Sequence, residues 1–347
     1  MTVEQARAAP IALRCRSKIV VTVALTAALS DAGFRTNDAR AQGAPSQGAA
    51  YPSKAMRLIV PFPAGGGADF IARLFAPKLN ESLGQPVIVE NRPGASTIIG
   101  GDLVAKAAPD AHTLFMATFT NAVNPALHPK MPWDITRDLA PVSLLSTASY
   151  TLAVHPSLPV KSPRELVAFA KARPGQLNFA SAGNGAPGHL AGELLNTVAN
   201  IKIVHVPYKG LAPALTDVLG GQVPITFGNN IATVPHLNSG RLRALGVTSA
   251  ARSRLMPAVP TMIEGGLPDF IVVGWYAIYA TAGSPQAAIA KLHAELARLV
   301  RDPDVQRRLT SDGSDPVGST PAELASFVRA EIDKWTKVVK SAGLQAD

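Results

Sequence analysis

The sequence predicts an α/β fold, in which strands and helices alternate along the chain after residue 50. Short apolar runs closed by turn residues recur along the chain, as expected of buried strands. Between them lie segments of about ten residues with apolar positions at helical spacing. With 47% apolar and 16% charged residues, the chain can also bury a large core. Strands separated by helices of this length imply βαβ units and mostly parallel sheets.

The first strand is predicted over residues 57–61, a short apolar run that ends at a proline. After a glycine-rich turn, an apolar stripe from Phe70 to Leu79 predicts a helix. Pro77 is expected to kink or shorten this helix, because proline removes a backbone donor. The first half continues with a strand at 87–90, a helix at 98–107 and a strand at 113–118.

The second half repeats this alternation of apolar runs and helical stripes. Strands are predicted at 150–154, 177–181, 203–206, 223–227, 243–248 and 270–280. Helices are predicted at 163–172, 189–198, 212–219, 285–300, 303–311 and 321–342.

The N-terminus has the organisation of an export signal. A basic stretch, residues 1–18, precedes eleven apolar residues at 19–29, too few for a membrane-spanning helix of about 20 residues. Cleavage sites are offered by Ala39-Arg40-Ala41 and, earlier, by Ala28-Leu29-Ser30. We therefore predict a signal peptide at 1–41, a flexible leader at 42–50, and a soluble, exported mature protein.

The single cysteine and the spread of charge exclude several functions. Cys15 precedes the apolar run and is expected to be removed, which leaves no disulfide, thiolate metal site or cysteine nucleophile and argues against a lipid anchor. The formal charge is +9, but basic residues are scattered, with no run longer than Arg307-Arg308. Together with only 5% aromatic residues, this scatter argues against nucleic-acid binding.

A glycine-rich loop follows the first predicted strand and precedes a helix. In open α/β sheets ligands bind beyond the carboxyl ends of the strands, where such loops lie. Glycines allow close approach of the backbone, and free N–H groups at a helix start suit an anion. Asp69 either caps the helix or contacts the ligand, and a triple glycine also fits a simple tight turn. The loop reads Ala64-Gly65-Gly66-Gly67-Ala68-Asp69.

A second loop of this kind follows the strand predicted at 177–181. Its glycines match G-x-G-x-x-G, but a dinucleotide site also needs an acidic residue about 20 positions onward. The next strand runs into Val206-Pro207-Tyr208-Lys209, which has none. A compact anion held by backbone N–H groups explains the same glycines. The loop reads Ser181-Ala182-Gly183-Asn184-Gly185-Ala186-Pro187-Gly188-His189.

Catalytic and metal-binding patterns are missing from the sequence. It contains neither a G-x-S-x-G elbow nor an H-E-x-x-H motif, and its histidines stand singly. We therefore expect no enzyme activity, no metal and no cofactor. His189, at a helix start, is the one histidine of interest. Trp275 and Tyr276 lie inside an apolar strand and are either core residues or a wall of the ligand site.

An ordered set of motifs resembles the Bug receptors, the TctC-type substrate-binding proteins of tripartite tricarboxylate transporters. The similarity runs from about Tyr51 to the C-terminus. Further matching segments lie at 212–217, 220–223, 243–248, 259–261 and 331–335. The three leading motifs are Val60-Pro61-Phe62-Pro63-Ala64-Gly65-Gly66-Gly67-Ala68-Asp69, Glu90-Asn91-Arg92-Pro93-Gly94-Ala95 and His205-Val206-Pro207-Tyr208-Lys209-Gly210.

The resemblance implies a two-lobed periplasmic binding protein with a type II-like clamshell of mixed, mostly parallel sheets. Domain 1 would combine residues 51–151 with 275–347, and domain 2 would span 152–274. The ligand would be a small carboxylate held by backbone N–H groups of both loops and passed to membrane transporter subunits by a monomeric receptor. The rest of the ligand would meet residues around Thr120, Asn121, Tyr208, Asn229 and Trp275.

One departure from the family pattern bears on the ligand. Relatives often carry an acidic residue where this chain has Gly228, in Phe227-Gly228-Asn229, so a ligand cannot be carried over from any one relative. Two alternative functions stay open at this point: a solute sensor that signals through a membrane partner, and an exported hydrolase.

Overall fold

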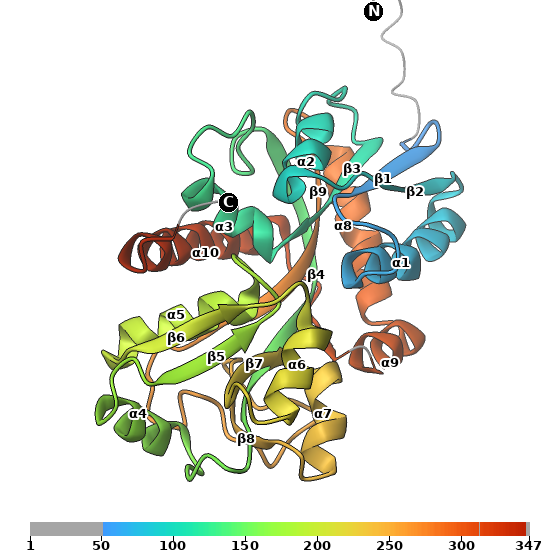
Figure 1. Ribbon diagram of the computed structural model, residues 1–347. Helices are drawn as coiled ribbons and strands as arrows, with labels where there is room; N and C mark the ends of the chain where they lie inside the picture. The colour runs from blue at the N-terminus through green and yellow to red at the C-terminus, as the bar shows by residue number, and fades with distance from the viewer. Residues whose placement is uncertain (1–50, 312, 345–347) are drawn as a thin grey trace, which may run out of the picture. The chain divides into compact units, whose positions relative to one another are not determined.

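The computed structural model describes residues 51–311 and 313–344 (Figure 1). The predicted signal peptide and leader, with Cys15, lie outside the described residues. Strands and helices alternate as the sequence predicts, so the α/β fold class is confirmed. Among the described residues, no helix combines the length and the hydropathy needed to cross a membrane.

The strands form a mixed sheet in the order β2-β1-β3-β9-β4-β7-β5-β6, with β8 and β10 both paired to β4. Parallel pairs lie toward the two ends of this order, whereas β4 and β9 in the middle run antiparallel to their neighbours. The strands are β1 Met56–Val60, β2 Val87–Asn91, β3 Thr113–Thr118, β4 Leu139–Val154, β5 Leu177–Ser181, β6 Ile203–Pro207, β7 Ile225–Asn229, β8 Arg243–Val247, β9 Val273–Thr281 and β10 Ser314–Pro316.

The helices cover the sheet and connect most of its strands (Figure 1). The C-terminal helix α10 packs against α3, α5 and β4, and so joins segments far apart in the sequence. The helices are α1 Gly67–Leu83, the short η1 Ala95–Thr97, α2 Ile98–Ala105, α3 Phe119–Leu127, α4 Pro163–Lys171, α5 Pro187–Ala199, α6 Leu211–Leu219, α7 Asn230–Asn238, α8 Gln286–Val300, α9 Pro303–Ser311 and α10 Pro321–Ser341.

Helix α1 is not shortened at Pro77, one of the two outcomes expected there, and continues to Leu83. Its apolar face is buried on both sides of the proline, at Phe75 and at Leu79. This packing offsets the backbone hydrogen bond that the proline removes. The helix ends at Gly84, whose positive φ of 71° lets its N–H group bond back to Asn80.

Strand β4 is much longer than the predicted 150–154, and its extra residues change the picture of the sheet. Residues 139–149 pair with β9, whereas 150–154 pair with β7 and β8. The pairing of β4 with β9 shifts register beside Pro141. Because of this proline and the serines of residues 139–149, the sequence did not predict a strand there. The switch of partners falls next to the predicted domain boundary at 151–152, and the boundaries themselves stay a prediction.

Two helices that the sequence did not predict, α3 and α7, begin directly after β3 and β7. Each contains an internal proline, Pro125 in α3 and Pro235 in α7, a residue that ordinarily interrupts a helix. Their position matters more than their length, because both begin at the carboxyl end of a strand.

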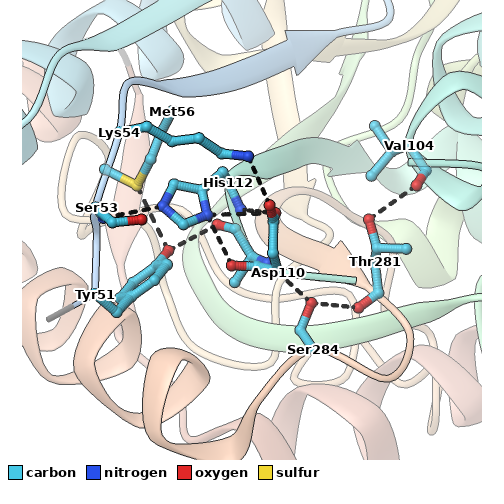
Figure 2. Close-up of polar contacts among 10 residues, drawn as sticks. Tyr51, Ser53, Lys54, Met56, Val104, Asp110, His112, Thr281 and Ser284 are labelled. Atoms are coloured by element: carbon cyan, nitrogen blue, oxygen red, sulfur yellow. Dashed lines mark hydrogen bonds and ion pairs between the residues drawn. The ribbon is translucent and has the colours of Figure 1, made fainter. Parts of the chain in front are cut away.

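The first described residues, 51–54, bond to the segment that precedes β3, at the amino end of that strand (Figure 2). The Tyr51 hydroxyl donates to the carbonyl of Ala111 at 2.7 Å, and the Lys54 ammonium lies 2.8 Å from the Asp110 carboxylate. The Ser284 hydroxyl accepts from the Ala111 N–H group at 3.2 Å. This network holds the segment that leads into the amino end of β3.

Candidate functional site

A cavity of about 370 Å³ lies at the carboxyl ends of β1 and β3, beside β9, and is called here the aromatic cavity. Its walls come from the β1–α1 loop, the β3–α3 junction, β4, β9 and the first residue of α5. No lining residue carries a charged side chain. The lining residues are Phe62, Pro63, Ala64, Gly66, Gly67, Ala68, Thr118, Phe119, Thr120, Tyr150, Pro187, Gly274, Trp275 and Tyr276.

Three helices begin at the wall of the aromatic cavity: α1 at Gly67, α3 at Phe119 and α5 at Pro187. The first N–H groups of a helix have no partner within it, and the helix dipole makes this end partly positive. A neighbouring cavity of about 290 Å³ shares Gly67 with the aromatic cavity and is also lined by Asn230, the first residue of α7. Convergent helix starts without charged side chains suit an anion.

Asp69 fixes the β1–α1 loop from within the fold. Its buried carboxylate accepts hydrogen bonds from the N–H group of Gly65 at 2.9 Å, from Arg73 Nε at 2.9 Å and from Asn91 Nδ2 at 2.9 Å. These donors, Arg73 first, lower the pKa of Asp69 to about 2. Asp69 is the third residue of α1, whose N-cap is Gly66, so it anchors the loop and is not the cap residue.

Two glycines of this loop are needed for different reasons. Gly65 has a φ of +87°, a conformation that side chains rarely adopt. A Cβ at Gly67 would overlap the hydroxyl oxygen of Tyr276, so glycine lets this tyrosine approach the start of α1. Gly66 has ordinary geometry, with a φ of −83°, and its nearest neighbour would lie 3.8 Å from an added Cβ.

Neutral groups hold the β5–α5 loop. The imidazole rings of His189 and His205 stack with centroids 3.8 Å apart, and the N–H group of Gly185 donates to His189 Nδ1 at 3.1 Å. His205 Nε2 lies 2.6 Å from the hydroxyl of Ser181. Burial lowers the pKa of His189 to about 4, and burial together with the neighbouring His189 does the same for His205. Both rings are therefore uncharged at neutral pH.

The β5–α5 loop faces a different cavity, of about 360 Å³, called here the histidine cavity. Pro187 is the residue of the segment 181–189 that lines the aromatic cavity. The histidine cavity is lined by Ser96, Leu127, His128, Asn184, Gly185, His189, Glu193, His205, Gly343 and Leu344.

Eleven residues of the two glycine loops and the five residues expected to meet the rest of the ligand make sixteen predicted site residues, which fall into groups. Asn229 lines the cavity of about 290 Å³ next to the aromatic cavity. Five line the aromatic cavity: Ala64, Gly66, Gly67, Thr120 and Trp275. Three line the histidine cavity: Asn184, Gly185 and His189. Seven are not lining residues of these three cavities: Gly65, Asp69, Asn121, Ser181, Ala182, Gly183 and Tyr208.

Two residues of the last group, Asn121 and Tyr208, form hydrogen bonds within the fold. The buried Asn121 accepts from the N–H group of Thr118 at 2.8 Å, at the start of α3, and donates to Thr97 at 2.8 Å. The Tyr208 hydroxyl donates to Asp217 at 2.6 Å, which raises the pKa of Tyr208 to about 12. Both side chains are thereby held in place by neighbouring residues.

Of the aromatic residues at the wall of the aromatic cavity, sequence reasoning offered Trp275 and Tyr276 and missed Phe62, Phe119 and Tyr150. Tyr150 comes from β4 and Tyr276 from β9, and a Cβ at Gly274 would lie 3.0 Å from the Tyr150 hydroxyl. Burial, and then the neighbouring Tyr276, raise the pKa of Tyr150, so its hydroxyl keeps its proton at neutral pH. Trp275 is both core and wall: it is 1% exposed and packs edge-on against Phe327.

The fold and the cavities define a class, the two-lobed α/β solute-binding receptors. The family described as "Tripartite tricarboxylate transporter family receptor" (TctC) matches residues 71–344. The chain therefore belongs to the TctC family, whose members and structural neighbours are periplasmic solute-binding proteins. The resemblance and the two-lobed fold class predicted from the motifs are both confirmed.

Several relatives support this assignment. BugT of Bordetella pertussis is 39% identical over 302 residues, which cover 86% of this chain and 93% of BugT. A Rhodopseudomonas palustris protein solved with adipate is 34% identical, with a TM-score of 0.71, and the match covers 85% of this chain and 99% of that one. MatC from Rhodopseudomonas palustris, with bound malate, is 34% identical, with a TM-score of 0.68 and coverage of 83% and 100%.

Proposed function

We propose that this receptor binds a small carboxylate in the aromatic cavity and delivers it to the membrane subunits of a tripartite tricarboxylate-type transporter. The observation that carries the proposal is the start of α1 and α3 at the wall of a cavity without charged side chains. Helix α5 also begins at this wall, but with Pro187, which has no N–H group. Unpaired N–H groups are then the positive element available to a ligand. Binding changes no covalent bond, in keeping with a family of receptors.

The relatives favour the same ligand class. Adipate and malate are the molecules bound in two solved structures with 34% identity, and both are small carboxylates. The family description also names a transporter as the partner of its receptors. We extend both features to this chain, together with export by residues 1–41, a periplasmic location and a monomeric state.

Capture would proceed by closure of predicted domain 2 over predicted domain 1. A carboxylate first meets the β1–α1 loop and the start of α3, where each favourable dipole interaction contributes about 0.3–1 kcal/mol while exposed. Rotation about the region where β4 changes partners then brings the starts of α5 and α7 toward the ligand and excludes water. Exclusion of water strengthens the N–H contacts.

A thermal-shift screen tests the proposed function. A ligand that binds the native state and not the unfolded chain raises the melting midpoint. We expect at least one small carboxylate to raise the midpoint, and its uncharged amide to have no effect. If no carboxylate in a broad panel shifts the midpoint, or if acid and amide act alike, the proposed function is contradicted.

A single substitution then tests the location of the site. Gly66→Val adds a branched side chain at the cavity wall, where the backbone geometry accepts it. We expect affinity for the carboxylate found in the screen to fall at least tenfold with folding retained. Gly220→Val is the matched control, since Gly220 has a φ of −81°, is exposed and lines none of the three cavities. Unchanged affinity in Gly66→Val would refute the location.

A further inference from the structure

We propose that the aromatic cavity selects a carboxylate with a single charge and an apolar, ring-bearing body over a dicarboxylate. This selectivity rests on the function proposed above and narrows its ligand. Three features support this selectivity. They are the aromatic walls, the absence of a positively charged side chain for a second carboxylate, and the hydrogen bonds that already occupy polar groups of the neighbouring cavity.

The walls are unusually rich in aromatic side chains. Five of the fourteen lining residues are aromatic, although the whole chain has only 19 aromatic residues in 347 (Trp 3, Tyr 5 and Phe 11). Flat rings bury a large area of an apolar partner and favour stacked or edge-on arrangements with another ring. The five are Phe62, Phe119, Tyr150, Trp275 and Tyr276.

Two of these walls are fixed by packing behind them. Phe119 meets Trp335 edge-on, with centroids 5.0 Å apart, and Trp275 meets Phe327 edge-on at 5.9 Å. Phe119 and Trp275 are 3% and 1% exposed. The cavity therefore presents a preformed apolar surface, which favours a rigid ring over a flexible polar chain.

The charge balance allows one carboxylate but not two. The first is met by N–H groups at the starts of α1 and α3. A second, on the body of the ligand, would lose water against apolar walls without a cationic side chain beside it, which is strongly unfavourable. The nearby cation Arg73 is already bound to Asp69 and Asn91.

The neighbouring cavity does not supply the missing countercharge. It too is lined by uncharged side chains, and several of its polar groups are already hydrogen-bonded. Asn230 donates to Ser149 at 2.7 Å and accepts from Thr151 at 2.8 Å, while Asn229 accepts the N–H group of Ala232 at 2.9 Å. Such a chamber suits an uncharged polar substituent better than a carboxylate.

Calorimetric titration with defined acids tests the selectivity. We expect benzoate or phenylacetate to bind at least tenfold more tightly than adipate or malate, and benzamide and phenylacetamide to bind far more weakly than their acids. If adipate or malate binds as tightly as the ring acids, the selectivity is overturned and the receptor function stands. If none of the four acids binds, the selectivity is overturned, and the broader screen decides the receptor function.

A wall variant gives a second test of the same idea. Phe62→Ala removes a half-buried ring at the cavity, and we expect affinity for the tighter-binding ring acid to fall about tenfold. Phe169→Ala is the matched control, because Phe169 is also half-buried but lies on α4, outside the cavity. Circular dichroism checks the fold, and Phe62→Leu replaces the alanine variant if that variant unfolds. Equal affinity in the Phe62 variant and wild type would overturn the proposal.

Discussion

The two glycine loops look alike in sequence but are held by different forces. Each follows a strand and precedes a helix. The β1–α1 loop is anchored by an ionised carboxylate, Asp69, paired with Arg73. The β5–α5 loop is anchored by two uncharged imidazoles, His189 and His205, stacked on each other. The β1–α1 loop is therefore stabilised while Asp69 is ionised, and the β5–α5 loop while His189 and His205 are uncharged.

This contrast also separates the loops by exposure and by cavity. Gly66 and Gly67 are exposed at the aromatic cavity, whereas Gly185 and His189 line the histidine cavity. A glycine-rich turn before a helix fixes local geometry, but the anchoring side chains set its response to acid. Three predictions, given in order of decreasing effect, test whether the two loops are held by these different forces.

The largest effect is expected from Asp69→Asn. The amide loses the charge that faces Arg73 and cannot accept all the hydrogen bonds that converge on the carboxylate. We expect the free energy of unfolding, measured with urea, to fall by about 2 kcal/mol, and carboxylate binding to weaken. Glu295→Gln is the control, because its pair with Arg298 is a surface ion pair of small value. Equal losses in the two variants would show that the β1–α1 loop does not depend on its charge.

The next effect is the response of the β5–α5 loop to mild acid. The native pKa values of His189 and His205, about 4, lie below the value of about 6.5 in the unfolded chain. The unfolded chain therefore binds more protons between these values, and stability falls as the pH drops from about 6.5 toward 4. We expect a loss of about 1 kcal/mol between pH 7 and pH 5 after allowance for solvent screening.

The same titration distinguishes the two loops. Asp69, with its lowered pKa of about 2, stabilises the fold above about pH 4 and loses this contribution only as the pH falls toward 2. It therefore adds nothing to the change between pH 7 and pH 5. Urea unfolding of His205→Gln should show a shallower slope in that window. A slope as steep as that of wild type would remove the histidine pair as its cause.

The smallest effect is expected from Gly67→Ala. The added methyl overlaps the Tyr276 hydroxyl, whose ring can shift slightly, so we expect a loss of about 0.5 kcal/mol in the free energy of unfolding. In the double variant Gly67→Ala/Tyr276→Phe the overlap is removed, and the loss should be smaller than the sum of the single changes. Strict additivity would show that the close approach does not constrain the β1–α1 loop.

Local features of this chain could be predicted from sequence, and tertiary neighbours could not. Strands β3 and β5 have the predicted bounds because each is a short apolar run between turn residues. The β1–α1 loop lies between a strand and a helix, as predicted, because the apolar run before it and the helical stripe after it are also local features. The second loop was expected at the same cavity, but the motif fixes its turn and says nothing of which cavity its residues face. Tyr150 was not predicted as a wall residue, because the pairing of β4 with β9 brings it to the cavity from a distant position in the chain.

Trp275 places a fluorescent side chain at the wall of the aromatic cavity. The chain has three tryptophans; Trp275 lines the aromatic cavity, while Trp133 packs against Phe115 and Trp335 against Phe119. Emission from an indole depends on the polarity of its surroundings, so displacement of water from the cavity should alter the fluorescence of Trp275 more than that of Trp133 or Trp335, which do not line the cavity. Variants with phenylalanine at positions 133 and 335 would leave a label-free reporter of occupancy in the protein itself.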